Sequence, residues 1–340
     1  MASNPRIDFY KFTLSSKTGD RKTFKDFAKE ELHAAANASN DDAFKKCFAH
    51  FIQDLEGSHA KNPARKQTIT VIPTAENNPY LHLKPAPSIQ RNVISGVING
   101  GPYDKEAVVS NIADNADNSN LGKDRSVLLP YFIFVYIPQD YNVGFFAIHS
   151  YNNADNITAL FRNYISNLFT GRNYKKAILE KFAPNSFQNE FRDGAVIESL
   201  GFSTTVLETT SSTDPIVRLL KEYNIKIEAV PKNKTISITE AQRVFDFFKA
   251  KVFRQKNDKE LKLEQFEKKK LTAQNEVTGK TKVFEWNTRE NEFTPTVYLD
   301  GRLKVVDGVP DFAELKQFCN NLFDDIKPEI RPDLYVTRAQ

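Results

Sequence analysis

Apolar residues recur along this chain with two different spacings, one typical of helices and one typical of strands. In residues 44–55 and 157–168 they fall every three or four positions, and a glycine follows each run. The same spacing extends over residues 312–326, with Pro310 before it and Pro328 beyond it. This spacing predicts three amphipathic helices that pack on a core, the last of which ends before Pro328.

Elsewhere apolar and polar residues alternate, as they do in the strands of a sheet. Residues 128–138 and 143–151 are the most apolar, and the four polar residues between them predict a central hairpin. Shorter strands are predicted at residues 6–14, 68–73, 80–85, 89–98, 261–266, 269–277, 280–286 and 295–299. The whole pattern predicts an α+β protein with antiparallel sheets, packed helices and two domains.

A Ser/Thr-rich stretch at residues 203–214 marks the predicted domain boundary. The N-terminal α+β domain, residues 1–205, contains the central hairpin 128–151 and an Asn/Asp-rich polar loop, residues 111–124. That loop lacks the spacing and the closing Glu of a calcium-binding loop, so calcium is not predicted there. The C-terminal α+β domain, residues 214–335, contains basic strands and the final amphipathic helix.

Composition supports a globular protein of the cell interior. Apolar residues make up 40% of the chain and include 27 Phe, which is ample to fill two cores. The two cysteines, Cys47 and Cys319, each fall on the apolar face of a predicted helix and are expected to be buried free thiols. Neither a signal peptide nor an apolar run of membrane-spanning length is present, so we expect a cytoplasmic location.

Positive charge is concentrated in one segment. The net charge is +4, whereas residues 249–282 alone carry eleven Lys and Arg against five Asp and Glu. This excess over a helix end and several strands suits a nucleic-acid phosphate backbone, with DNA favoured over RNA. The alternative is a solvated surface, with lysines that protect edge strands. The predicted contacts are Arg254, Lys256, Lys262, Lys268, Lys269 and Lys270.

A second basic group surrounds Tyr174. Arg172, Lys175 and Lys176 could hold phosphates while the tyrosine stacks on a base. The alternative interpretation is the ordinary solvated face of a helix.

No complete catalytic motif is present, and we predict no catalytic residue, metal or cofactor. The GKT of residues 279–281 lacks the first glycine of a phosphate-binding loop, because residue 274 is Gln, and this region reads as a hairpin turn. Glu260 and Lys262 match half of a metal-dependent nuclease site, for which Asp246 or Asp258 would have to supply another ligand. His149 lies on an apolar strand face and is expected to pack in the core.

Two stretches, residues 129–165 and 275–326, resemble in element order the RexA-like phage-exclusion sensors and similar bacterial abortive-infection proteins. The resemblance implies a homodimer that binds DNA, senses phage replication and signals to a separate effector protein, often one in the membrane. It carries over no catalytic residue, only the expectation of a basic surface facing DNA.

The leading hypothesis is therefore a non-enzymatic nucleic-acid-binding sensor or regulator in anti-phage defence. Two alternatives stay open: a metal-dependent nuclease that uses Glu260 and Lys262, and a protein-interaction subunit whose lysines only keep it soluble.

Overall fold

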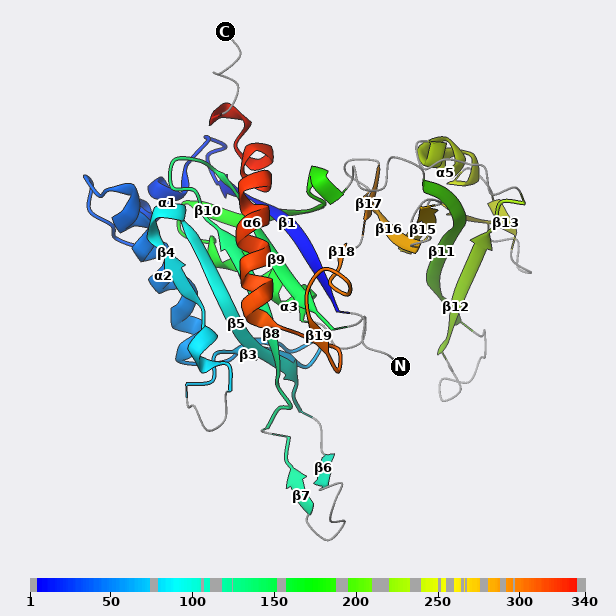
Figure 1. Cartoon of the computed structure of the whole chain (residues 1–340), viewed down its shortest axis with the longest axis horizontal. Coiled ribbons are helices and arrows are strands. Elements are labelled where there is room, and N and C mark those ends of the chain that lie inside the picture. Colours follow the sequence, from blue (N-terminus) through cyan, green and yellow to red (C-terminus); the bar gives the residue numbers. More distant parts are fainter. Residues whose placement is uncertain are drawn as a thin grey trace. The chain divides into compact units, whose positions relative to one another are not determined.

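The computed structural model divides into two compact units, and Figure 1 shows their elements. The first unit comprises Met1–Phe182 and Val297–Gln340, and the second comprises Ala183–Thr296. Both contain helices and antiparallel sheets, which confirms the predicted α+β class. The structure describes residues 5–73, 79–104, 107–110, 118–123, 125–151, 157–187, 195–209, 220–232, 240–249, 252–254, 260–263, 266, 268–275, 281–287, 292–295 and 297–334.

A nine-stranded antiparallel sheet forms the centre of the first unit, in the order β10-β1-β9-β8-β5-β3-β2, with β18 beside β1 and β4 beside β5. The predicted central hairpin is confirmed as β8 and β9, which pair with each other. The strands are β1 (Arg6–Ser16), β2 (Ala60–Asn62), β3 (Gln67–Thr70), β4 (Ala86–Ser88), β5 (Val93–Pro102), β8 (Leu129–Tyr136), β9 (Val143–Ser150), β10 (Tyr174–Phe182) and β18 (Val297–Tyr298).

Helices cover both faces of this sheet. On one face lie α1 (Phe24–Glu30), α2 (Asn40–Glu56) and α3 (Thr158–Leu168), whose buried side chains form one core with the sheet. On the other lies α6 (Phe312–Ile330), which crosses the front of the sheet in Figure 1. Its Phe323 ring lies 5.8 Å from that of Phe134 and 4.9 Å from that of Tyr136. Because both faces are covered, β8 is apolar at nearly every position.

The helix starts follow the sequence closely. Thr23 and Asp26 form a reciprocal capping box at the start of α1, as their spacing predicts. Asp311 accepts hydrogen bonds from two backbone N–H groups at the start of α6. The predicted end of α6 is wrong, because Pro328 lies inside the helix. Burial of Ile330 on the core favours continuing the last turn through the proline.

Short elements complete the first unit and change two predictions. Residues 80–85 were expected to be a strand, but residues 81–83 form a 3-10 helix; Pro85 lacks the N–H that a paired strand needs. Within the predicted polar loop, residues 118–121 form a strand, and residues 111–117 lie outside the described part. These elements are η2 (Leu81–Leu83), η3 (Ile89–Arg91), β6 (Ala107–Ser110), β7 (Asn118–Leu121), β19 (Val305–Val306), β20 (Val309–Pro310) and η6 (Pro332–Leu334).

The second unit contains a five-stranded antiparallel sheet in the order β12-β11-β15-β16-β17 and a separate pair, β13 and β14. The helix α5 (Ala241–Lys249) packs on the larger sheet, where Phe245 joins Phe202 and Leu271 in a buried cluster. The strands are β11 (Ala195–Thr209), β12 (Leu220–Ala229), β13 (Val252–Arg254), β14 (Glu260–Lys262), β15 (Lys268–Asn275), β16 (Thr281–Asn287) and β17 (Glu292–Pro295).

The compact units do not divide the chain where the Ser/Thr-rich stretch suggested. That stretch begins inside β11, which continues to Thr209 and pairs with β12 from Leu200 to Thr209. The final helix α6 belongs to the first unit, because its aromatic side chains pack on β8 and β9. Within the described part of the chain, no helix has both the length and the apolar content needed to cross a bilayer.

Candidate nucleic-acid interface

Among the described residues of the second unit, α5 packs on one face of the five-stranded sheet, and this fixes where the lysines of β15 point. Leu271 and Ala273 of β15 are buried with Phe202 of β11 on the α5 side. Side chains alternate between the two faces of a strand, so Lys270 and Thr272 point to the opposite face. We call this opposite side the open face.

Small residues of β11 line the middle of the open face. Gly201 pairs with Lys270 on one side and with Glu228 on the other. A Cβ atom placed on Gly201 would meet no described atom within 4 Å, so a methyl group fits at this position. The described side chains of the open face are Val196, Ser199, Ser203, Lys226, Glu228, Lys270, Thr272, Gln274 and Val283, arranged around Gly201. Val196 is buried there, and only Lys226 and Glu228 are exposed.

The three consecutive lysines of β15 do not form the single patch that the sequence suggested. Lys269 pairs with Phe202 and shares its α5-covered face, where it is half-buried. Lys270 lies on the open face and is half-buried as well. The backbone of Lys268 pairs with that of Ser203, and its side chain lies outside the described part. The run was read as one charge cluster because sequence alone does not show which face α5 covers.

The other predicted contacts of this segment lie on different elements. Arg254 ends β13 and pairs with Glu260, while Lys262 is exposed at the end of β14. Lys256 lies outside the described residues. The predicted set therefore divides between the small β13–β14 pair and the five-stranded sheet.

The second basic group lies in the first unit, on a strand and not on a helix. β10 pairs with β1 in the register Tyr174 to Ser16, so the segment is drawn into the edge of the nine-stranded sheet. Arg172, just before β10, donates its backbone N–H to Glu31 at 2.9 Å. Lys175 and Lys176 are both exposed, and as neighbours on a strand they point to opposite faces.

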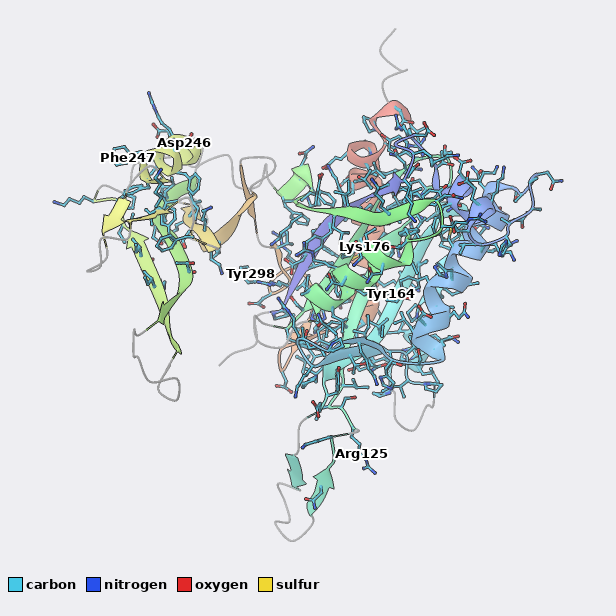
Figure 2. The ribbon with its side chains drawn as sticks, turned by 180° about the vertical axis from the view of Figure 1, so that it is seen from behind. Arg125, Tyr164, Lys176, Asp246, Phe247 and Tyr298 are labelled. Atoms are coloured by element: carbon cyan, nitrogen blue, oxygen red, sulfur yellow. The ribbon has the colours of Figure 1, made fainter. Side chains whose placement is uncertain are left out.

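Lys176 faces a hollow of about 550 Å³ that also contains Asn163, Asn167 and Tyr164 of α3. Figure 2 labels Tyr164 and Lys176 on the side of the first unit that faces away from α6. Lys61 of β2 and His59 complete the basic lining, and Lys175 is not part of it. We call this site the α3 hollow. Its members come from three separate segments, so sequence spacing did not join them.

A second hollow, of about 530 Å³, lies at the start of α6. Val309, Pro310 and Phe312 give it a largely apolar lining, and Lys304 is its one lysine. The backbone N–H of Lys304 donates to Glu314 at 2.7 Å, which places a carboxylate at this helix start. The hollow is therefore a poor site for an anion.

The structure describes only part of the residues that the nuclease alternative needs. Glu260 and Lys262 do lie on a strand, β14, as the motif requires. Asp246 lies on α5, whereas Asp258 and the side chain of Glu260 lie outside the described part. Among the described residues no group of three or more His, Cys, Asp or Glu side chains could hold a metal ion. The GKT residues fall in the sequence between the end of β15 and the start of β16. These two strands pair with each other, as the predicted hairpin requires.

His149 and the two cysteines are buried, as predicted. His149 is fully buried against the rings of Tyr131, Tyr151 and Phe312. Within the described residues neither of its ring nitrogens has a hydrogen-bond partner, and burial lowers its pKa to about 3. Burial raises the pKa of Cys47 to about 12, with Gln139 opposing the shift, so its thiol is unreactive.

Sequence reasoning missed the contribution of two strands to the open face. Lys226 of β12 is exposed and pairs with Ser203 of β11. The alternation of Ser199, Gly201 and Ser203 with the buried Leu200 and Phe202 was visible in the sequence. A one-sided sheet produces this pattern, and it could have placed the small residues on a common face.

Comparisons with models of protein families, with curated proteins and with solved structures found no match to this chain.

Proposed function

We propose that this protein is a non-enzymatic nucleic-acid-binding protein, with DNA preferred over RNA, and that the open face of the second unit contacts the phosphate backbone. One observation carries the proposal: the exposed Lys226 and the half-buried Lys270 flank a row of small residues on the side of the sheet opposite α5. The local excess of positive charge in residues 249–282 supports the same conclusion.

The geometry suits a phosphate chain better than it suits base recognition. The small side chains of Ser199, Gly201 and Ser203 let a polymer approach the backbone, while lysines on both sides supply point charges. Among the described side chains of the open face, Gln274 is the one amide that could read a base edge, and none is aromatic. Binding should therefore depend steeply on salt and little on sequence. Glu228 opposes phosphate on this face and limits the affinity.

The biological role that we propose follows from the resemblance to abortive-infection sensors. The protein would act in the cytoplasm as a homodimer that detects phage nucleic acid and signals to a separate effector protein, such as one in the membrane. The resemblance covers residues 129–165 and 275–326 and supports a regulator more than an enzyme.

The direct test is the Lys226→Glu/Lys270→Glu double variant, measured by fluorescence anisotropy with short DNA and RNA duplexes and single strands. We expect a several-fold loss of DNA affinity at low salt. The slope of log affinity against log salt should also flatten by about 0.9 for each duplex phosphate contact removed.

The matched control is Lys46→Glu, which makes the same charge change at an exposed position on α2 of the first unit. It should leave affinity nearly unchanged. Equal affinities for the double variant and the wild type would refute the open face as the contact surface. Absence of any salt-dependent binding by the wild type would favour the protein-interaction alternative.

The nuclease alternative rests on the placement of Glu260 and Lys262 on β14. Incubation of the whole protein with supercoiled plasmid and Mg²⁺ or Mn²⁺ tests it. Cleavage that disappears in Glu260→Ala would establish an enzyme. No cleavage, or cleavage that survives in this variant, would remove the alternative.

A further inference from the structure

We propose that the α3 hollow of the first unit binds a small nucleoside phosphate. This site is separate from the open face and does not depend on the nucleic-acid contact proposed above. Its volume of about 550 Å³ lies within the range of roughly 300–1,000 Å³ that small-ligand pockets occupy.

Three polar side chains of the hollow are available for a ligand. Asn163 and Asn167 lie one turn apart on α3, both exposed beside Leu160 and Tyr164 of its buried stripe, and Lys176 extends from β10. Within the described residues these three side chains make no hydrogen bond or ion pair. They therefore lose no internal partner when a ligand binds.

Positive charge reaches the hollow from two separate elements. Lys176 lies on β10, and Lys61 lies on β2 with its ammonium 5.7 Å from the centre of the Tyr103 ring. Tyr103 does not line the hollow, so the Lys61 ammonium has to turn from this ring to join Lys176 at a phosphate group, where each would be a charge-assisted donor.

His59 adds a hydrogen-bonding ring nitrogen. The Thr68 hydroxyl oxygen lies 3.2 Å from the Ala60 carbonyl oxygen and 3.2 Å from Nδ1 of His59. When the hydroxyl donates to Ala60, Nδ1 donates to the hydroxyl and Nε2 keeps a lone pair for a ligand. Burial, and after it the charge of Lys61, lowers the pKa of His59, so the ring is neutral at pH 7.

The mixed chemistry of the lining favours a nucleoside phosphate over phosphate alone. Asp54 would repel a bare anion but can accept hydrogen bonds from sugar hydroxyls. The side-chain amides of Asn163 and Asn167 offer both donors and acceptors, which matches the edge of a base. Leu160, which is buried and also lines the hollow, adds an apolar surface for a ring. Lys61 and Lys176 then hold the phosphate.

The test is isothermal titration calorimetry of the full chain with AMP, GMP, CMP and UMP, and with adenosine and inorganic phosphate as partial ligands. At least one nucleotide should bind more tightly than both partial ligands. Lys176→Glu should weaken that binding by at least about tenfold, because it removes a hydrogen bond from a charged group. Asn163→Leu/Asn167→Leu should weaken it while leaving phosphate binding unchanged.

Lys175→Glu is the matched control, since it changes the neighbouring charge on the opposite face of β10 and should not alter nucleotide affinity. Circular dichroism confirms that each variant is folded, and Lys176→Gln replaces Lys176→Glu where it is not.

The proposal is overturned by no binding of any nucleotide, by equal losses at positions 175 and 176, or by phosphate binding as tightly as the nucleotides. Lys226→Glu/Lys270→Glu should keep full nucleotide affinity. Failure of this proposal can therefore be told apart from failure of the proposed nucleic-acid contact.

Discussion

The two large sheets of this protein differ in how many of their faces are covered. The nine-stranded sheet has helices on both faces, so β8 and β9 are buried at almost every position. In the described part of the five-stranded sheet, α5 covers one face, and the other is mostly polar but includes Val196 and Val283. A fully covered sheet can act only as a scaffold, whereas a half-covered sheet offers a broad surface on which a ligand can lie. Binding surfaces are therefore expected on the second sheet and at the edges of the first.

The largest expected effect comes from removing a ring from the fully covered sheet. Phe146 is fully buried between Tyr10, Phe12 and Phe161, so Phe146→Ala should destabilise the first unit by about 3–5 kcal/mol. Urea unfolding followed by circular dichroism measures this loss. The sole tryptophan, Trp286, lies on β16 of the second unit, so its fluorescence should report a transition that the variant leaves in place.

A matched pair of glycines compares the packing of the two sheets directly. A Cβ on Gly144 would lie 2.5 Å from the Phe12 ring and 2.5 Å from the Tyr136 carbonyl oxygen, whereas a Cβ on Gly201 meets nothing within 4 Å. Gly144→Ala should therefore cost about 1–3 kcal/mol, and Gly201→Ala should be neutral or slightly stabilising. Denaturant midpoints of the two variants test this. Equal losses would show that the open face is not open.

The pH dependence of stability tests the dry interior of the first sheet. The pKa of His149 is about 3 in the folded chain, against about 6.5 when unfolded. Below pH 6.5 the unfolded chain binds a proton that the folded chain does not, so stability falls as the pH falls toward 3. The loss should reach about 2 kcal/mol at pH 5.

His149→Phe removes the titrating group and keeps a ring beside Tyr131 and Tyr151. The free energy of unfolding of both proteins is measured at pH 7 and pH 5. We expect a smaller loss in the variant. The same loss in both proteins would mean that other groups cause the acid sensitivity.

Much of the first unit was predictable because its signals are local and strong. The capping box at Thr23 and Asp26, the stripes of α2 and α3 and the β8–β9 hairpin all follow from residues close together in the sequence. The end of α6 was not predictable in this way, because burial of Ile330 carries the helix past Pro328. Tertiary packing decides such cases, and sequence spacing does not record it.

The candidate sites were harder to predict because they depend on faces and on distant segments. The lysine run of β15 is obvious in the sequence, yet only the position of α5 separates Lys269 from Lys270. Lys61, Asn163 and Lys176 lie on three elements far apart in the chain and meet only in the folded unit. Charge counting found the basic segment but could not find a hollow.

The chain leaves and re-enters the first unit at neighbouring points of one strand. β10 ends with Phe182 opposite Phe9, and β18 begins with Val297 opposite Ile7, so both ends of the second unit start two positions apart along β1. The second unit is thus an insertion whose removal leaves a gap that a short loop can close. A protein organised in this way can lose, gain or exchange its inserted unit while the first unit keeps its own core.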